Sequence, residues 1–150
     1  INCSCNAVLL IRRCQLWAGK GAIGKMISRY YSNKLKTKYG IFVTGSKKIG
    51  KGLKLPHPNG IIIGVNEIGK NCTIYQQVTF GSKNIGDFKY NLQPNVGDNC
   101  VFFAGSKIIG NIKIANGTTV GANCVLNLDT EENSTYVGIP AHIVKKKNQS

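Results

Sequence analysis

Two histidines, His57 and His142, are the side chains of this 150-residue sequence best suited to acid–base chemistry at neutral pH. His57 stands in the loop sequence Pro-His-Pro-Asn-Gly, at positions 56–60. A neutral imidazole with a pKa of about 6.5 can accept a proton from a hydroxyl group, so His57 is a candidate general base. A single histidine in a loop can equally be an exposed or hydrogen-bonded structural residue. The residues alone leave both interpretations open.

The six cysteines are the other reactive side chains: Cys3, Cys5, Cys14, Cys72, Cys100 and Cys124. No two of them have the C-x-x-C spacing of a zinc site, and two histidines are too few to complete one, so we expect no metal. Three of the cysteines fall on a sequence repeat at positions that favour a small buried residue. We therefore expect free thiols and a reducing, cytoplasmic compartment.

The element that must position His57 is a repeat with a step of six residues. Its larger members are Val43, Ile49, Leu55, Ile62, Ile68, Ile74, Phe80, Val96, Phe102, Ile108, Ile114, Val120 and Leu126. A compact residue follows many of these four positions later: Cys72, Val78, Cys100, Ser106, Thr118 and Cys124. A step of six matches neither a helix nor a simple strand, and it is typical of hexapeptide β-helix repeats. The sequence therefore predicts a triangular prism whose coils of 18 residues stack about 4.8 Å apart.

Two interruptions break this repeat. The step from Leu55 to Ile62 is seven, so the loop around His57 adds one residue. The step from Phe80 to Val96 is sixteen, so residues 81–95 contain a ten-residue excursion. Because a solenoid displays its insertions on one face, often the binding face, we place the candidate site where His57 and the excursion meet in neighbouring coils.

The first part of the chain follows a different pattern. Apolar residues recur at helical spacing over positions 7–17 and 22–39, and Lys and Arg fill much of the rest. We predict two short amphipathic, basic helices separated by glycines. The predicted organisation is a basic helical segment over 1–42, a β-helical domain over 43–145 and a basic tail over 146–150.

The charge is strongly positive, at +14 from 20 Lys and Arg against 6 acids, and no acid precedes Glu67. This asymmetry favours anionic partners such as phosphate-bearing cofactors, polyanions or lipid headgroups. A peripheral membrane or polyanion contact through the basic helices stays open. No nucleic-acid recognition motif occurs, so we expect no nucleic-acid partner. No run of 18 apolar residues occurs either, so we expect no membrane-spanning helix.

Four segments resemble the serine acetyltransferase branch of the hexapeptide-repeat acyltransferases. They are LPHPNGIIIG, IGKNCTIYQQVTFG, AGSKIIGNIKIANGTTVGANCVL and YVGIPAHIV, in that order within about residues 43–145. The resemblance implies an all-β fold, a left-handed parallel β-helix with short N-terminal α-helices, assembled as a homotrimer. It also implies an O-acetyltransferase that uses acetyl-CoA as co-substrate.

The resemblance assigns roles to particular residues. The histidine matching His57 is the general base that deprotonates the acceptor hydroxyl. Asp87 in the excursion is the candidate acid that orients His57, from the same or another subunit, and His142 is expected at the surface. The cofactor-binding candidates by motif position are Ala104, Gly105, Gly121 and Ala122, through their backbone along the pantetheine arm, and Lys145, near the nucleotide phosphates.

The sequence also departs from that branch. The position just before the histidine holds Pro56 instead of an acid, and Phe42 occupies a second acidic position. An Asp-Arg-His-Pro segment that holds the amino acid reads Asn-Leu-Gln-Pro over Asn91 to Pro94. Leucine cannot replace the paired donors of an arginine toward a carboxylate. The short Pro-His-Pro-Asn-Gly version is more similar to enzymes that acetylate sugars.

The resulting prediction is an acetyl-CoA-dependent O-acetyltransferase that modifies a sugar hydroxyl in a surface polysaccharide or its precursor. The first alternative is a serine O-acetyltransferase of cysteine biosynthesis. The second is a β-helical binding module without catalytic activity, in which His57 is incidental. A zinc carbonic anhydrase on the same prism needs three histidines, and the sequence has two.

Overall fold

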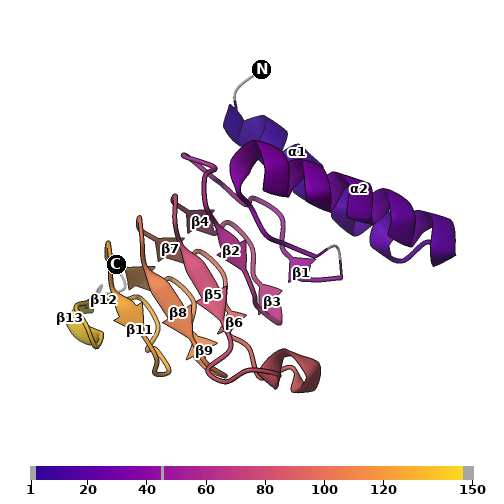
Figure 1. Cartoon of the computed structure of the whole chain (residues 1–150). Coiled ribbons are helices and arrows are strands. Elements are labelled where there is room, and N and C mark those ends of the chain that lie inside the picture. The colour runs from indigo at the N-terminus through magenta and orange to yellow at the C-terminus, as the bar shows by residue number, and fades with distance from the viewer. Residues whose placement is uncertain (1–2, 45, 147–150) are drawn as a thin grey trace.

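The computed structural model describes residues 3–44 and 46–146, and Figure 1 shows two helices beside one end of a stack of short strands. Helices α1 (Cys3–Ala18) and α2 (Gly21–Tyr39) pack side by side. Gly40 ends α2 at φ 62°, where its N–H reaches two carbonyls of the last turn. The two predicted helices are confirmed, and the first begins earlier than expected. No helix of the described ranges combines the length and the apolar character needed to cross a bilayer.

The strands form three sheets, which are the three faces of a prism. The first face holds β1 (Lys48–Ile49), β3 (Glu67–Ile68), β6 (Asn95–Val96) and β9 (Lys113–Ile114). The second holds β4 (Thr73–Ile74), β7 (Val101–Phe102), β10 (Thr119–Val120), β12 (Ser134–Val137) and β13 (His142–Lys146). The third holds β2 (Ile62–Ile63), β5 (Thr79–Gly81), β8 (Lys107–Ile109) and β11 (Val125–Leu126). Every pairing is parallel except that of β12 with β13, so the predicted parallel β-helix is confirmed.

The strand register measures the length of each coil. Asn95 of β6 pairs with Lys113 of β9, eighteen positions further along, as the repeat predicts. Glu67 pairs with Asn95, twenty-eight positions further along, because ten additional residues leave the prism between β5 and β6. Residues 82–94 form this excursion, which contains the short 3-10 helix η1 (Asp87–Tyr90).

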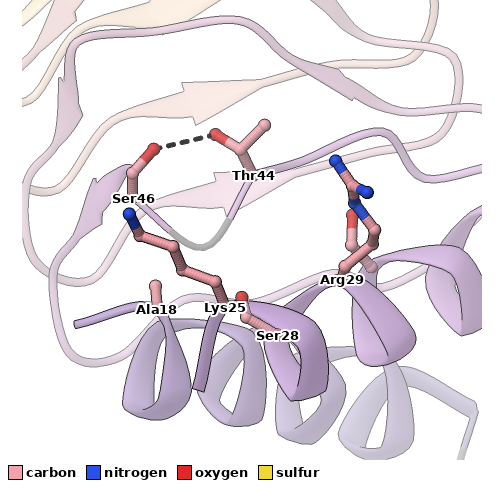
Figure 2. Close-up of a pocket in the computed structure, with 7 residues that line it drawn as sticks. Ala18, Lys25, Ser28, Arg29, Thr44 and Ser46 are labelled. Carbon is pink, nitrogen blue, oxygen red and sulfur yellow. Dashed lines mark hydrogen bonds between the residues drawn. The ribbon is translucent and has the colours of Figure 1, made fainter. Parts of the chain in front are cut away.

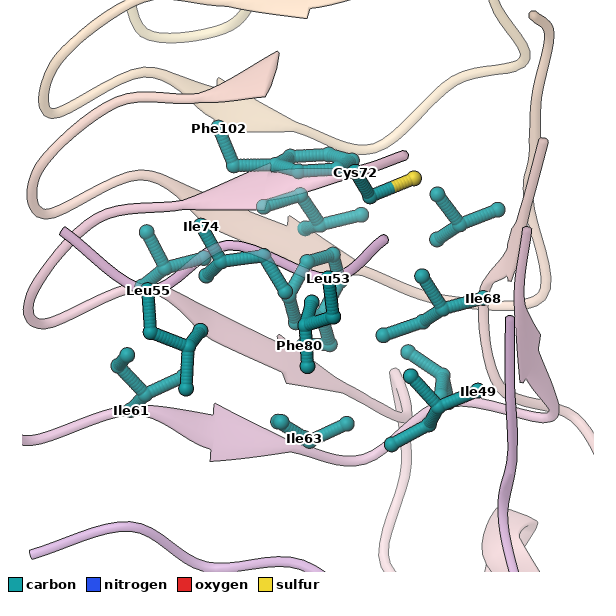
Figure 3. Close-up of a cluster of buried hydrophobic side chains, with 14 of the residues drawn as sticks. Ile49, Leu53, Leu55, Ile61, Ile63, Ile68, Cys72, Ile74, Phe80 and Phe102 are labelled. Carbon is teal, nitrogen blue, oxygen red and sulfur yellow. The ribbon is translucent and has the colours of Figure 1, made fainter. Parts of the chain in front are cut away.

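The repeating aliphatic and aromatic residues fill the interior of the prism, as Figure 3 shows for its first coils. The predicted inward positions that are no more than 3% exposed are Leu55, Ile68, Ile74, Phe80, Val96, Phe102, Ile108, Ile114, Val120 and Leu126. The Phe80 and Phe102 rings meet edge to face at 4.8 Å, on neighbouring coils. The compact residues Cys72, Cys100 and Cys124 are buried as predicted.

One predicted inward position is wrong. Ile62 is 41% exposed, whereas Ile63 is 3% exposed and pairs with Phe80. Successive side chains of a strand point to opposite sides, so only one of these two isoleucines can face the interior. The turn around His57 therefore adds two residues to its side of the prism, and the following side, which ends at Ile68, is one residue shorter.

Both helices are fixed to the first coil by side chains. Arg12 of α1 donates to the carbonyl oxygen of Ile49 at 2.6 Å, and Gln15 donates to that of Lys47 at 3.1 Å. Ser32 of α2 donates to the carbonyl oxygen of Val43 at 2.7 Å. The segment from Val43 to Ile49 is thus held from both helices.

Candidate active site

His57 lies on a turn at the corner between the second and third faces of the prism. Lys54, just before the turn, bridges to Thr73 on the second face, and β2 follows it on the third face. Inside the turn, the Asn59 N–H donates to the His57 carbonyl oxygen at 2.8 Å, and the Asn59 carbonyl oxygen accepts from the Gln77 N–H at 2.9 Å. The next coil therefore fixes the backbone around an exposed imidazole.

Two aromatic rings lie at the same corner as His57, one on each of the next two coils. The His57 ring lies 6.1 Å from the Tyr75 ring, and Tyr75 stacks on Phe103 at 5.2 Å. Within the described residues, no side-chain hydrogen bond to the imidazole is formed, so no acid orients it from the same chain. The corner can present a base against an aromatic wall, and it leaves one side of that base open.

Small residues occupy the same corner further along the stack. The Gly105 and Gly121 N–H groups are used by the prism itself, because they donate to the Gln76 and Tyr136 carbonyl oxygens at 3.0 and 2.8 Å. The cofactor contact predicted for the backbone of both glycines stays a prediction, and their N–H groups are already paired within the prism. The Ala104 and Ala122 N–H groups have no hydrogen-bond partner within the described residues. They are the backbone donors left for a ligand.

Gln76 was missed by the sequence analysis. Its side-chain oxygen Oε1 is buried and has no hydrogen-bond partner in the described ranges. Gln76 occupies the turn position that holds Ala104 and Ala122 on the next coils. A large polar residue where the repeat otherwise places alanine was the signal available in the sequence. Gln76 is therefore a candidate for contact with a ligand at the His57 corner.

The structure does not bring Asp87 to His57 within one chain. The excursion leaves the prism between the third and first faces, which is a different corner from that of His57. The Asp87 carboxylate accepts from the Asn84 N–H at 2.8 Å and from the Asn84 side-chain amide at 3.2 Å, and so stabilises the excursion. The expectation of one site built by neighbouring coils fails because the two insertions emerge from different corners.

The lysine predicted to lie near the cofactor phosphates, Lys145, is at the C-terminal end of the second face. Lys145 is exposed on β13 and pairs with Thr135 of β12. Its neighbour Lys146 forms an exposed ion pair with Glu131 at 2.7 Å. His142 is exposed, as predicted. The predicted tail beyond Lys146 lies outside the described residues.

The corner of the excursion holds a cavity of about 490 Å³, with Lys47 and Gln93 among its lining residues. The Lys47 ammonium donates to the Gln93 side-chain oxygen at 2.7 Å. Burial lowers the pKa of Lys47. A smaller cavity of about 270 Å³ lies beside it, and Figure 2 shows Lys25 and Arg29 extending from α2 toward the segment of Thr44 and Ser46. His57 lines neither cavity.

Two of the buried thiols, Cys14 and Cys100, are poor nucleophiles. The hydrogen bond with Cys72 and then burial raise the pKa of Cys100 far above its usual range. Burial raises the pKa of Cys14 to about 11. A thiol is a strong nucleophile only as the thiolate, so these side chains do not suit a covalent acyl-enzyme. No group of three His, Cys, Asp or Glu that could hold a metal ion occurs within the described residues.

Comparisons with known proteins bear on the chemistry. No family model matches the chain. It is 42% identical over 121 residues to a serine acetyltransferase of Staphylococcus aureus strain Mu50, which covers 80% of this chain and 53% of that protein. A serine acetyltransferase of Staphylococcus epidermidis strain RP62A is also 42% identical, over 127 residues, which covers 81% of this chain and 59% of that protein. The chain spans about half the length of the curated relatives it matches.

Solved structures agree with these relatives. A serine acetyltransferase in complex with CoA has a TM-score of 0.80 at 28% identity, covering 92% of this chain and 55% of that one. The soybean enzyme complexed with serine has a TM-score of 0.82 at 29% identity, covering 92% of this chain and 56% of that one. The predicted left-handed β-helix is confirmed, and the acyltransferase prediction is supported. The predicted sugar acceptor is wrong, because these relatives are serine acetyltransferases and favour the alternative.

Proposed function

We propose that this chain is the acetyl-CoA-binding, β-helical part of a serine O-acetyltransferase. The observation that carries the proposal is the 42% identity to serine acetyltransferases, over a match that covers 80% of the chain. Solved serine acetyltransferases with the same fold bind CoA in one structure and serine in another. Substrate and co-substrate are thus those of the proteins that the chain is similar to.

The proposed chemistry follows from the placement of His57. Its neutral imidazole takes the proton of the serine hydroxyl while the hydroxyl oxygen attacks the thioester carbonyl carbon of acetyl-CoA. The tetrahedral intermediate then collapses, the carbon–sulfur bond breaks, and the imidazolium returns the proton to the CoA sulfur. The products are O-acetylserine and CoA, and no cysteine takes part. The exposure of the imidazole supports this role, because both substrates must reach it.

The cofactor would lie along the His57 corner. The unpaired N–H groups of Ala104 and Ala122 supply donors there, and Lys145 lies at the far end of the adjoining face. His57 and β13 are separated by about four coils, or roughly 20 Å of stacked strands. A long cofactor could therefore place its thioester near the imidazole and its phosphates near the lysines.

We further propose a homotrimer in which the excursion of one copy meets the His57 corner of the next. Four exposed apolar side chains on the excursion support it: Ile85, Phe88, Tyr90 and Leu92. Apolar side chains gathered on one exposed segment are typical of a contact surface. Asp87 does not lie at the His57 corner of its own chain. In this arrangement it could approach the His57 corner of a neighbouring copy. Light scattering coupled to size-exclusion chromatography tests the arrangement, and a monomer would contradict it.

The decisive experiment follows the release of free CoA thiol from acetyl-CoA with L-serine as the acceptor. Nucleotide sugars and polysaccharides serve as comparison acceptors. We expect turnover with L-serine to exceed turnover with every sugar. Absence of turnover with L-serine in the assembled protein would contradict the proposed function.

We propose a cytoplasmic location, which acetyl-CoA as co-substrate and the absence of disulfides among the described cysteines support. A peripheral contact through α2 is a separate proposal. Ile23 and Met26 are exposed beside Lys25 and Arg29. Exposed apolar side chains between cations suit an anionic lipid surface. Sedimentation with anionic and neutral vesicles tests this contact.

A further inference from the structure

The cavity of about 490 Å³ at the excursion corner has the walls of a small-molecule site. It lies between α2, strand β2 and the excursion. Its polar lining includes Lys36, Lys47 and Gln93, and its apolar lining includes Phe42, Ile62 and Phe88. No Asp or Glu is among the described residues that line it. The cavity therefore offers positive charge beside apolar surface, with no carboxylate of its own.

Lys47 is fixed in this wall. Its ammonium donates to the Gln93 side-chain oxygen at 2.7 Å, and its carbonyl oxygen accepts from Gln15 of α1 at 3.1 Å. An ammonium group has three donors, and Gln93 uses one of them. Lys146 with Glu131 is the ion pair formed within the described ranges, so Lys47 has no counterion there. A half-buried cation without a counterion is costly, and an incoming anion would remove that cost.

Gln93 extends the polar wall. Its side chain is buried, at 6% exposure, and its carbonyl oxygen faces the Lys47 ammonium. Its amide nitrogen lies 3.2 Å from the position that a Cβ on Gly64 would occupy, so the bare backbone of Gly64 gives it room. That nitrogen has no hydrogen-bond acceptor in the described ranges. Its N–H groups are therefore available to donate to a ligand in the cavity.

Another part of the cavity wall is apolar and favours contact with the carbon atoms of a ligand. Phe42, Ile62 and Phe88 are each between 41% and 57% exposed and line the same cavity. The Lys36 ammonium lies 5.2 Å from the centre of the Phe42 ring and adds a second positive charge. Inorganic phosphate would leave this apolar wall uncovered. A small organic carboxylate would cover it while its oxygens accept from the cations.

We infer that this cavity binds the carboxylate of a small organic acid, through the Lys47 ammonium and the Gln93 amide. That the acid is L-serine rests on the proposed function. Lys47 then determines acceptor specificity from a position forty-six residues before Gln93. The carbon part of the acid lies against Phe42, Ile62 and Phe88.

The test compares three probes on the 150-residue chain by ligand-observed NMR: L-serine, L-serinamide and inorganic phosphate. L-serinamide has a neutral amide in place of the carboxylate. For Lys47→Met we expect L-serine to bind about tenfold to a hundredfold more weakly and L-serinamide binding to be unchanged. Lys48→Met, on the exposed neighbouring residue, is the matched control and should bind both as the wild type does. Equal L-serine binding by Lys47→Met and the wild type would overturn the inference, and so would tighter binding of phosphate than of L-serine.

A second variant keeps the test decisive if Lys47→Met does not fold. Gln93→Glu places a carboxylate against Lys47, so the new side chain forms an ion pair with the ammonium. The protein should remain folded. It should bind L-serine as weakly as we expect for Lys47→Met. Thermal unfolding monitored by circular dichroism checks the fold. Undiminished L-serine binding by folded Gln93→Glu would overturn the inference.

Thiol-release kinetics separate this inference from the proposed function. If both hold, Lys47→Met raises KM for L-serine and leaves kcat close to that of the wild type. If the wild type binds L-serine through Lys47 and releases no thiol, the carboxylate site stands and the proposed function fails. If the wild type acetylates L-serine and Lys47→Met has the same KM, the proposed function stands and the carboxylate site fails.

Discussion

The two corners of the prism that carry insertions have complementary chemistry. The His57 corner has a candidate base, aromatic rings and unpaired backbone donors, but within the described residues no hydrogen bond or ion pair from a charged side chain to the imidazole. The excursion corner has two lysines and a buried amide beside an apolar wall, but no histidine. Neither corner alone can both hold an amino acid and deprotonate its hydroxyl. Under the proposed function, a complete site would combine one corner from each of two copies.

The largest expected effect tests the His57 corner. His57→Ala removes the base and should lower kcat/KM for L-serine by about 10²–10⁴. His142→Ala, at an exposed position on β13, is the control and should retain wild-type kcat/KM. Thiol release from acetyl-CoA is the measurement. Near-normal activity of His57→Ala would mean that this corner does not carry the chemistry.

The next effect tests the excursion corner through its backbone. A Cβ on Gly64 would lie 2.6 Å from the Phe80 carbonyl oxygen and 3.2 Å from the Gln93 amide nitrogen. Gly64→Ala should therefore lower the free energy of unfolding by about 1–3 kcal/mol and raise KM for L-serine. In Gly81→Ala the new Cβ meets only Ile109, at 3.7 Å, so this variant is the control. Urea unfolding and thiol release measure the two effects, and equal behaviour of both variants would contradict the packing argument.

A smaller effect tests the aromatic wall. Tyr75→Leu removes the ring that lies 6.1 Å from His57 and stacks on Phe103. Loss of such a ring pair costs about 0.5–1.5 kcal/mol, so we expect kcat/KM to fall about two- to tenfold. Tyr75→Phe keeps the ring and should restore most of the activity. If Tyr75→Phe is as impaired as Tyr75→Leu, the hydroxyl and not the ring is important.

The smallest effect concerns a region that belongs to neither corner. Burial between α1 and α2 raises the pKa of the Cys14 thiol from 9.0 to about 11, so the folded chain holds that proton more tightly than the unfolded chain. This contribution is present below about pH 9 and is lost as the pH rises toward 11. The urea midpoint should fall over this range, and less so for Cys14→Ala. L-serine binding should fall over the same range in the wild type and in Cys14→Ala alike, because the Lys47 ammonium, whose pKa burial lowers, loses its proton there.

The prism and its core could be predicted because a step of six is visible along the chain. The positions from Ile68 to Leu126 follow it on both sides of the excursion, and all of them are buried. Ile62 was assigned wrongly because Ile61, Ile62 and Ile63 are consecutive isoleucines, and composition cannot say which one points inward. Strand pairing with Phe80 decides it.

The site was harder to predict than the fold. His57 stood out as a histidine in an insertion, whereas the choice of corner depends on counting residues around each coil. The sugar acceptor was inferred from Leu92 and Gln93 as a local segment that lacks a cation. The structure places the Lys47 ammonium on Gln93 from the segment just before β1. Such a contact between distant residues leaves no trace in either local sequence.

The antiparallel strand β13 has a consequence for association between molecules. A stack of parallel coils exposes an unpaired strand edge at its end, and such an edge can template further strands from another chain. β13 turns back along β12 and covers that edge with a strand whose residues are all exposed and include Lys145 and Lys146. Like charges at this edge would repel a second prism approaching end to end. The reversal of a single strand thus disfavours end-to-end association of two prisms through this sheet.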